Sequence, residues 1–270
     1  MEKLFDKDLE STIKNAFLKE ITEKPPRIGL IGVSGVGKSS TINAMFKTDL
    51  EISHVKACTK EFKTVNLSVE INEGEATGNK ALLQIIDAPG LGEDIALDPK
   101  YLEMYKDNLG KCDIILWVLT ARNRAIALDQ MYLKQLEEFG HKMVFGINQV
   151  DLIDPIDWNT KLNLPSKEQE ANMNIILEDR KEKLEIIMGR EISIIPYSAE
   201  HKYKLEELFA EMIITAPKER AWIFTSIKAF SPFDFVPEEI REQVINQVKK
   251  NDLYSNNEGQ KGWLGNFFNK

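Results

Sequence analysis

The chain is poor in the residues that build disulfide frameworks and metal centres. Among its 270 residues there are two cysteines, Cys58 and Cys112, and three histidines. Two cysteines this far apart give neither a disulfide framework nor a metal-ligand spacing, and no histidine is paired with a cysteine or an acid at ligand spacing. The composition therefore argues against a disulfide-rich secreted protein and favours a reducing compartment.

Long hydrophobic runs are also missing. No apolar run approaches the ~18–20 residues that span a bilayer, and the first residues carry no apolar signal region. We therefore expect a cytoplasmic protein. A net charge of -8 argues against nucleic-acid binding over the whole surface. With 43% hydrophobic and 29% charged residues, the composition is typical of a soluble globular protein. The length of 270 residues predicts one large domain or one domain with small appendages.

The most informative feature that is present lies at 27–40. A strand-like apolar segment leads into the pattern G-x-x-x-x-G-K-S, which begins at Gly32, and a helix-compatible segment follows. The glycines let successive backbone N–H groups point at phosphate oxygens, and the start of the helix offers further N–H groups to the same anion. The pattern predicts a nucleoside triphosphate site in which Lys38 reaches the phosphates and Ser39 binds Mg²⁺. The expected phosphate-binding residues of this loop are Ser34, Gly35, Val36, Gly37, Lys38, Ser39 and Ser40.

Strand-like and helix-like segments alternate along the chain. The strand-like segments are 27–32, 61–71, 81–87, 113–119, 142–148 and 191–196, and the helical ones are 38–47, 98–109, 125–139, 167–189 and 202–214. This alternation predicts an α/β fold, the P-loop NTPase three-layer sandwich with a mostly parallel six-stranded sheet. Because a hairpin-type connection joins the second and third segments, we expect one antiparallel edge strand.

Helical extensions are expected at both ends of this domain. Residues 1–26 contain an amphipathic pattern, 27–216 form the nucleotide-binding domain, and 217–270 are expected to form a helical extension with a flexible tail. The N-terminal helix is expected to pack on the domain or to self-associate. Its evenly mixed charges disfavour a membrane-surface role, which stays open together with a membrane contact by the aromatic residues at 263–268.

A second constellation follows the third strand. Asp87 comes at its end and Gly90 follows three residues later, within the pattern Asp-x-x-Gly. In P-loop proteins an acid at this place orders Mg²⁺, and the glycine N–H can contact the γ-phosphate. A threonine between the P-loop and Asp87 is expected to complete the magnesium site. We favour Thr59 over Thr64, because a loop residue can move onto the metal and release it after hydrolysis.

Two further motifs indicate guanine as the base. Asn148-Gln149-Val150-Asp151 ends a buried strand and resembles the Asn-Lys-x-Asp guanine motif, with Gln149 where lysine is usual. The carboxylate of Asp151 can accept from the guanine N1–H and 2-amino groups, a donor pair that adenine lacks. Asn148 is expected to tie this loop to the P-loop. After the sixth strand, Ser198-Ala199 resembles the loop whose backbone N–H contacts the guanine oxygen.

These five motifs, in this order, resemble the TRAFAC-class GTPases and in particular the Era-like small bacterial GTPases. The resemblance covers roughly 27–214, and the P-loop spelling is also similar to the septin-like AIG1/Toc group and the immunity-related GTPases. It implies GTP and GDP as ligands and Mg²⁺ as cofactor. It implies a nucleotide-dependent switch that acts through 48–60 and 90–100. Leu91 stands where the family often carries a water-orienting glutamine, which implies slow intrinsic hydrolysis.

The source of the missing catalytic group stays open. Relatives that use a bound potassium ion as this group carry an asparagine at the fourth P-loop position. This chain has Gly35 there, which argues against stimulation by potassium. Other candidates are Glu93, Asp94, Arg122 and Arg124, each of which is more often a solvated loop charge, so no catalytic residue is assigned.

The alternatives to a switch are a self-assembling scaffold GTPase that dimerises through its G domain or terminal helices, and an Era-type RNA or ribosome factor. The nearly balanced charge after 217 makes nucleic acid an unlikely partner. The effector or activator is left unassigned.

Overall fold

The computed structural model describes residues 12, 16, 19–46, 62–70, 80–91, 98–122 and 126–226. The expected switch threonine Thr59, most of the expected N-terminal helix and the chain after 226 lie outside these residues. Within the described part of the chain, no helix has both the length and the apolarity needed to cross a membrane.

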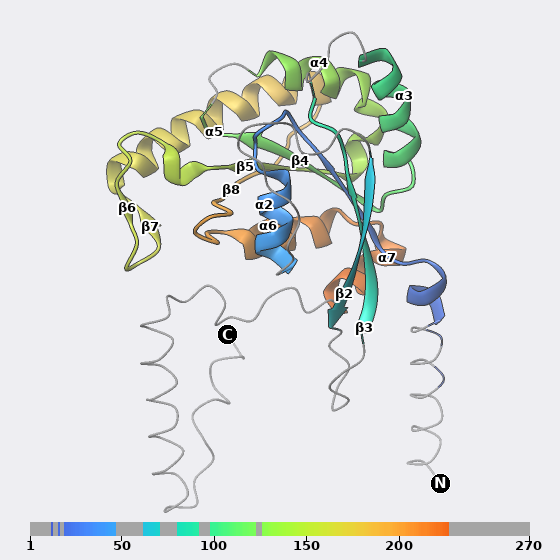
Figure 1. The fold of residues 1–270 in the computed structure, drawn as a ribbon. Coiled ribbons are helices and arrows are strands. Elements are labelled where there is room, and N and C mark those ends of the chain that lie inside the picture. Colours follow the sequence, from blue (N-terminus) through green and yellow to red (C-terminus); the bar gives the residue numbers. More distant parts are fainter. Residues whose placement is uncertain are drawn as a thin grey trace, which may run out of the picture.

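A six-stranded sheet forms the middle layer of the fold (Figure 1). Its strands, in spatial order, are β2 (Lys63–Glu70), β3 (Lys80–Asp87), β1 (Arg27–Ile31), β4 (Ile114–Thr120), β5 (Met143–Asn148) and β8 (Ile194–Pro196). The edge strand β2 runs antiparallel to β3, and all other neighbouring strands are parallel. The predicted fold class, including its one antiparallel edge strand, is confirmed.

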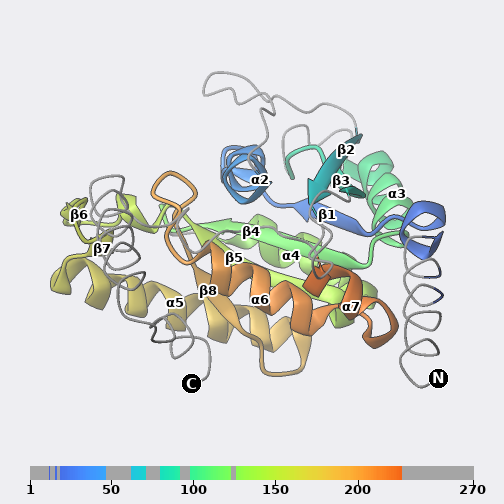
Figure 2. The same cartoon turned by 90° about the horizontal axis from the view of Figure 1, so that it is seen from below.

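Helices cover both faces of the sheet (Figures 1 and 2). One face carries α2 (Lys38–Phe46), α6 (Leu205–Thr215) and α7 (Lys218–Ser226), and the other carries α3 (Asp98–Leu109), α4 (Ala127–Gln135) and α5 (Lys167–Met188). In β4 the side chains alternate between two hydrophobic clusters, with Ile114, Leu116 and Val118 in one and Ile115, Trp117 and Leu119 in the other. Such burial on both faces explains why this strand is continuously apolar.

Several short elements depart from the sequence expectation. A two-stranded hairpin, β6 (Trp158–Asn159) with β7 (Leu164–Pro165), precedes α5, and 3₁₀ turns occupy η1 (Glu137–Lys142) and η2 (Val150–Leu152). The last strand, β8, has three residues where 191–196 was expected. Strands this short carry no repeating pattern of burial, so periodicity cannot reveal them.

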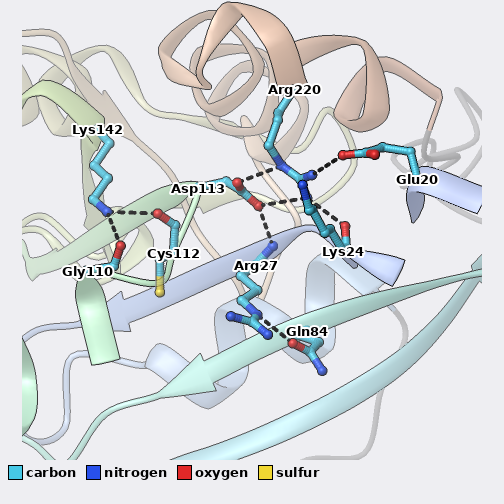
Figure 3. Close-up of polar contacts among 9 residues, drawn as sticks. All are labelled: Glu20, Lys24, Arg27, Gln84, Gly110, Cys112, Asp113, Lys142 and Arg220. Atoms are coloured by element: carbon cyan, nitrogen blue, oxygen red, sulfur yellow. Dashed lines mark hydrogen bonds and ion pairs between the residues drawn. The ribbon is translucent and has the colours of Figure 1, made fainter. Parts of the chain in front are cut away.

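A polar network ties α7 to the start of the sheet (Figure 3). The Arg220 guanidinium lies 2.7 Å from Asp113, lies 3.5 Å from Glu20 and donates to the Lys24 carbonyl at 2.8 Å. Asp113 in turn accepts from the backbone N–H of Arg27 at 2.8 Å. Ile223 and Phe224 of α7 are fully buried in the same cluster as β1. The first turns after 217 therefore pack directly on the sheet.

A buried lysine closes the turn between α3 and β4 (Figure 3). The Lys142 ammonium donates to the carbonyl oxygens of Leu109 at 2.8 Å, Gly110 at 3.2 Å and Cys112 at 2.8 Å. These include carbonyls at the C-terminus of α3, where a helix leaves its acceptors unsatisfied and where a positive charge is stabilising. Burial lowers the pKa of Lys142, while the neighbouring Cys112 and Asp113 act in the opposite direction.

Replacing Lys142 with methionine should destabilise the fold strongly. Methionine preserves most of the apolar stem but removes the ammonium that these carbonyls share, and a buried carbonyl left without a donor costs about 1–3 kcal/mol. We expect the free energy of unfolding to fall by about 2–4 kcal/mol in urea titrations. Lys134→Met, on the exposed face of α4, is the matched control and should change it by less than about 0.5 kcal/mol. A Lys142→Met protein as stable as the wild type would contradict this account of the turn.

Candidate nucleotide-binding site

The predicted P-loop connects β1 to α2, and two of its glycines are required by close contacts. Gly32 has φ +151°, and a Cβ there would lie 2.3 Å from the Val118 carbonyl oxygen. Gly37 has φ +90°, and a Cβ there would lie 2.3 Å from the side-chain nitrogen of Asn148. The loop therefore packs against both β4 and β5, so any larger residue at these two positions would push it away from the sheet.

The Lys38 side chain folds back over this loop. Its ammonium donates to the carbonyl oxygens of Gly32 at 2.9 Å and Val33 at 3.4 Å, and the residue is buried. Ser34 and Gly35 are exposed at the tip, Val36 is buried, and the remaining loop residues Gly37, Ser39 and Ser40 are half-buried. The loop thus combines accessible backbone at its tip with a cation held beside it.

The Asp-x-x-Gly segment runs alongside the P-loop. The N–H of Ala88 donates to the Leu30 carbonyl at 3.2 Å, and the N–H of Leu91 donates to the Gly32 carbonyl, also at 3.2 Å. Asp87 therefore ends β3 beside the loop that carries Ser39, and its side chain is buried. A carboxylate and a serine hydroxyl are both oxygen ligands of the kind that Mg²⁺ prefers, so the chemistry of Asp87 and Ser39 fits the metal.

The Leu91 side chain is part of the hydrophobic core. It is 2% exposed and packs in the cluster that contains Ile31 and Tyr105. The Tyr105 hydroxyl of α3 donates to the carbonyl oxygen of Pro89, which fixes the turn that carries the buried Gly90. A leucine in this core position has no polar atom with which to orient water.

Asn148 lies at the centre of the site and joins three segments. Its Nδ2 donates to the Val36 carbonyl of the P-loop at 2.9 Å, and its Oδ1 accepts from the Ala199 N–H at 3.0 Å. The residue itself ends β5 and is buried. The contact with the P-loop that the sequence predicted is therefore present, and the same amide also holds the Ser198-Ala199 turn.

Gln149 extends from β5 toward the P-loop. Its backbone is left-handed, with φ 65°, and its Oε1 accepts from the Thr120 hydroxyl at 2.6 Å. The Nε2 donates to the Gly35 carbonyl at a longer distance of 3.4 Å. The side chain thus lies between the end of β4 and the tip of the P-loop.

Asp151 lies in the η2 turn, and a residue that sequence analysis missed holds this turn. Gln169, fully buried on α5, donates through Nε2 to the carbonyl oxygens of Asp151 and Ile153, both at 3.0 Å. The sequence signal was Ser166-x-x-Gln169, a capping-box pattern in which Ser166 accepts from the Gln169 N–H at 3.2 Å. The glutamine side chain, however, reaches across to the η2 turn.

Tyr197 joins the Ser198-Ala199 turn to α2, the helix that follows the P-loop. Sequence analysis also missed this contact. Its hydroxyl lies 2.8 Å from the Thr41 hydroxyl, which donates to the Gly37 carbonyl at 2.8 Å. Tyr197 is fully buried, and burial raises its pKa. Next to it, the Ser198 hydroxyl accepts from the His201 N–H at 3.1 Å. Hydrogen bonds between buried polar groups therefore connect the P-loop with the Ser198-Ala199 turn.

The expected catalytic candidates gain no role from this geometry. Arg122 is exposed, and its backbone N–H donates to the Thr120 hydroxyl at 3.1 Å. Glu93, Asp94 and Arg124 lie outside the described residues.

Comparison with known proteins places this arrangement in context. Residues 27–149 match the family model described as 50S ribosome-binding GTPase. Uncharacterized protein YfjP of Escherichia coli (strain K12) is 34% identical over 160 residues, which cover 58% of this chain and 52% of YfjP. GTPase Der of Acinetobacter baumannii (strain AB0057) is 30% identical over 128 residues, which cover 47% of this chain and 25% of Der. The matched stretches thus span about half of YfjP and a quarter of Der.

One solved structure supports the fold. The crystal structure of Era in complex with MgGDPNP and nucleotides 1506–1542 of 16S ribosomal RNA matches with a TM-score of 0.50 and 21% sequence identity. The match covers 72% of this chain and 57% of that chain.

Proposed function

We propose that the chain is a P-loop GTPase of the Era-like TRAFAC kind, a GTP-binding protein that hydrolyses GTP slowly and acts as a nucleotide-dependent switch. The observation that carries the proposal is the Asn148 amide, which bonds to Val36 of the P-loop and to Ala199 of the adjacent turn. The P-loop and the two segments proposed to bind the base are thereby held as one unit, which supports a single site for a guanine nucleotide.

Asp151 is proposed to select guanine. Its carboxylate would accept hydrogen bonds from N1–H and the 2-amino group, and Gln149 would cover the base. The Ala199 N–H already donates to Asn148, so the guanine 6-oxygen would either share this donor or accept from the next N–H, that of Glu200. A base without this donor and acceptor pattern would leave these buried groups unpaired.

The P-loop side is proposed to bind the phosphates and Mg²⁺. The loop N–H groups and the Lys38 ammonium would contact phosphate oxygens, with the ammonium exchanging its present carbonyl acceptors for them. Ser39 and Asp87, with Thr59 as the proposed third residue, would hold Mg²⁺. When bound, the metal neutralises charge on the β- and γ-phosphate oxygens.

The packing of Leu91 supports the proposal of slow hydrolysis. Because its side chain is buried in the core between β1 and α3, this position offers no hydrogen-bonding group to the attacking water. Turnover would then depend on the nucleotide, the metal and the backbone donors until another group is supplied from outside.

GTP turnover per molecule, measured across a wide range of protein concentrations, tests the proposal. A switch that awaits an external activator should show slow turnover that does not change with concentration, and light scattering should show equal size with GDP and GTP. Turnover that rises with concentration, together with growth in size under GTP, would instead establish the self-assembling alternative. Lys38→Ala should abolish turnover, which excludes a contaminating phosphatase.

A ribosome-directed role is a second candidate, and it rests on the description of the matching family as 50S ribosome-binding GTPases. Co-sedimentation of the chain with 50S subunits should then be stronger with a non-hydrolysable GTP analogue than with GDP. Equal or absent sedimentation in both states would remove this candidate.

A further inference from the structure

The β6–β7 hairpin lies between the η2 turn of Asp151 and the long helix α5. Trp158 pairs with Pro165 and Asn159 with Leu164, and the Asn159 side chain accepts from the N–H groups of Lys161 and Leu162 at 3.1 Å and 3.0 Å. The Ser166 cap of α5 follows directly, so the hairpin is fixed at its base as well as at its tip. The motifs alone give this hairpin no role.

Its inner side contacts the 198–203 turn, which carries Ala199. The ring of Trp158 stacks on His201 with centroids 5.2 Å apart and meets the ring of Tyr203 edge-on at 5.0 Å. Aromatic pairs at such distances contribute about 0.5–1.5 kcal/mol beyond their burial. Trp158 therefore anchors this turn through two ring contacts.

Asn163 completes the contact through both ends of its amide. Its Oδ1 accepts from the Trp158 indole N–H at 3.1 Å, and its Nδ2 donates to the His201 carbonyl at 2.9 Å. Its backbone has φ 52°, a left-handed conformation that asparagine tolerates better than most residues. The hairpin is thus built so that one amide bridges the tryptophan and the backbone of the turn.

The opposite side of the turn is held by the predicted guanine site. Ser198 and Tyr203 exchange backbone hydrogen bonds of 3.1 Å and 3.0 Å, and the Ala199 N–H donates to Asn148. Within the turn, Lys202 has φ 51°, a conformation that costs a lysine free energy and therefore needs support from its surroundings. The 198–203 turn is therefore held by the hairpin on one side and by Asn148 on the other.

We propose that the β6–β7 hairpin is a clamp that positions the 199–200 backbone N–H groups for the 6-oxygen of the bound base, with Trp158 and Asn163 as positioning residues. This inference rests on the proposed function, since it concerns recognition of the same guanine. Such a clamp would affect the contact between the 199–200 N–H groups and the 6-oxygen of the base. Asp151 is held separately, through the bond from Gln169 to its backbone carbonyl. Loss of the clamp should therefore weaken one part of base recognition and spare the other.

Three diphosphates separate these contributions in calorimetric titrations with Mg²⁺. GDP has the 6-oxygen, N1–H and the 2-amino group. IDP keeps the oxygen and N1–H but lacks the amino group, and 2-aminopurine riboside diphosphate keeps the amino group but lacks both the oxygen and N1–H. Asn163→Gly preserves access to positive φ and removes the amide, and Trp158→Leu removes the stacking. Each variant should raise the Kd of GDP and IDP by about fivefold to tenfold, the equivalent of one neutral hydrogen bond, and leave that of the 2-aminopurine nucleotide unchanged.

Leu162→Ala is the matched control, because this side chain is exposed on the same hairpin. It should leave all three affinities unchanged. If the wild type binds no GDP, the proposed function itself fails. If the wild type binds GDP but the variants lose affinity for all three nucleotides equally, or for none, the clamp is contradicted and the proposed function stands. Should Trp158→Leu fail to fold, Asn163→Gly decides the question by the same comparison.

Discussion

Replacing Asp151 with asparagine should turn a guanine-nucleotide site into one that prefers xanthine nucleotides. The asparagine amide would present an N–H to the guanine 2-amino group, which is itself a donor. Xanthine has an oxygen at this position, and that oxygen can accept from the asparagine N–H. Charge-assisted hydrogen bonds are worth about 1.5–3 kcal/mol each, so the Kd of GDP should rise by about 100-fold or more, while XDP gains affinity. Competition between GDP and XDP for the protein measures the reversal.

The structure gives this substitution a sharp control. Asp157→Asn removes the same charge nearby, but Asp157 is exposed, so the preference for GDP should stay unchanged. If Asp151→Asn also leaves the preference for guanine intact, Asp151 does not contact the base and the assignment of the base pocket is wrong.

Asn148→Ala should separate the phosphate side of the site from the base side. The substitution leaves the Val36 carbonyl and the Ala199 N–H without the partners seen here, and a buried group without a partner costs about 1–3 kcal/mol. We expect the free energy of unfolding to fall by about 2–4 kcal/mol and the Kd of GDP to rise by at least about tenfold. Chemical denaturation and calorimetry give the two quantities separately.

Asn174→Ala, at an exposed position of α5, provides the comparison for Asn148→Ala. It should alter neither quantity measurably. An Asn148→Ala protein that loses stability yet binds GDP as tightly as the wild type would mean that the link between the two sides is structural and does not serve nucleotide binding.

The fold was predictable because its central strands can be recognised from short stretches of the sequence. The continuous apolar runs of β4 and β5 require burial on both faces, and polar motif residues such as Asp87 and Asn148 follow directly where buried strands end. In a parallel sheet such ends lie along one edge, and the contact of Asn148 with the P-loop was expected from its motif.

The contacts that hold the site together were not predictable in the same way. Gln169 crosses from α5 to the η2 turn, and Tyr197 reaches Thr41 of α2, and neither distance along the chain nor residue type specifies such a pairing. The β6–β7 hairpin has two-residue strands that are too short for any period, and Asn163 looks like an ordinary loop residue until its left-handed backbone and both amide contacts are seen. These links depend on tertiary packing.

Paired titrations of GDP and ADP into the full chain, each with Mg²⁺, test the central claim that the P-loop and the Asn148–Asp151 segment form one guanine-nucleotide site. We expect one GDP to bind per chain, with ADP weaker by about 1,000-fold or more, because a site built around buried hydrogen bonds rejects a base that cannot make them. Equal affinities for GDP and ADP, or GDP binding that survives Lys38→Ala unchanged, would contradict the account.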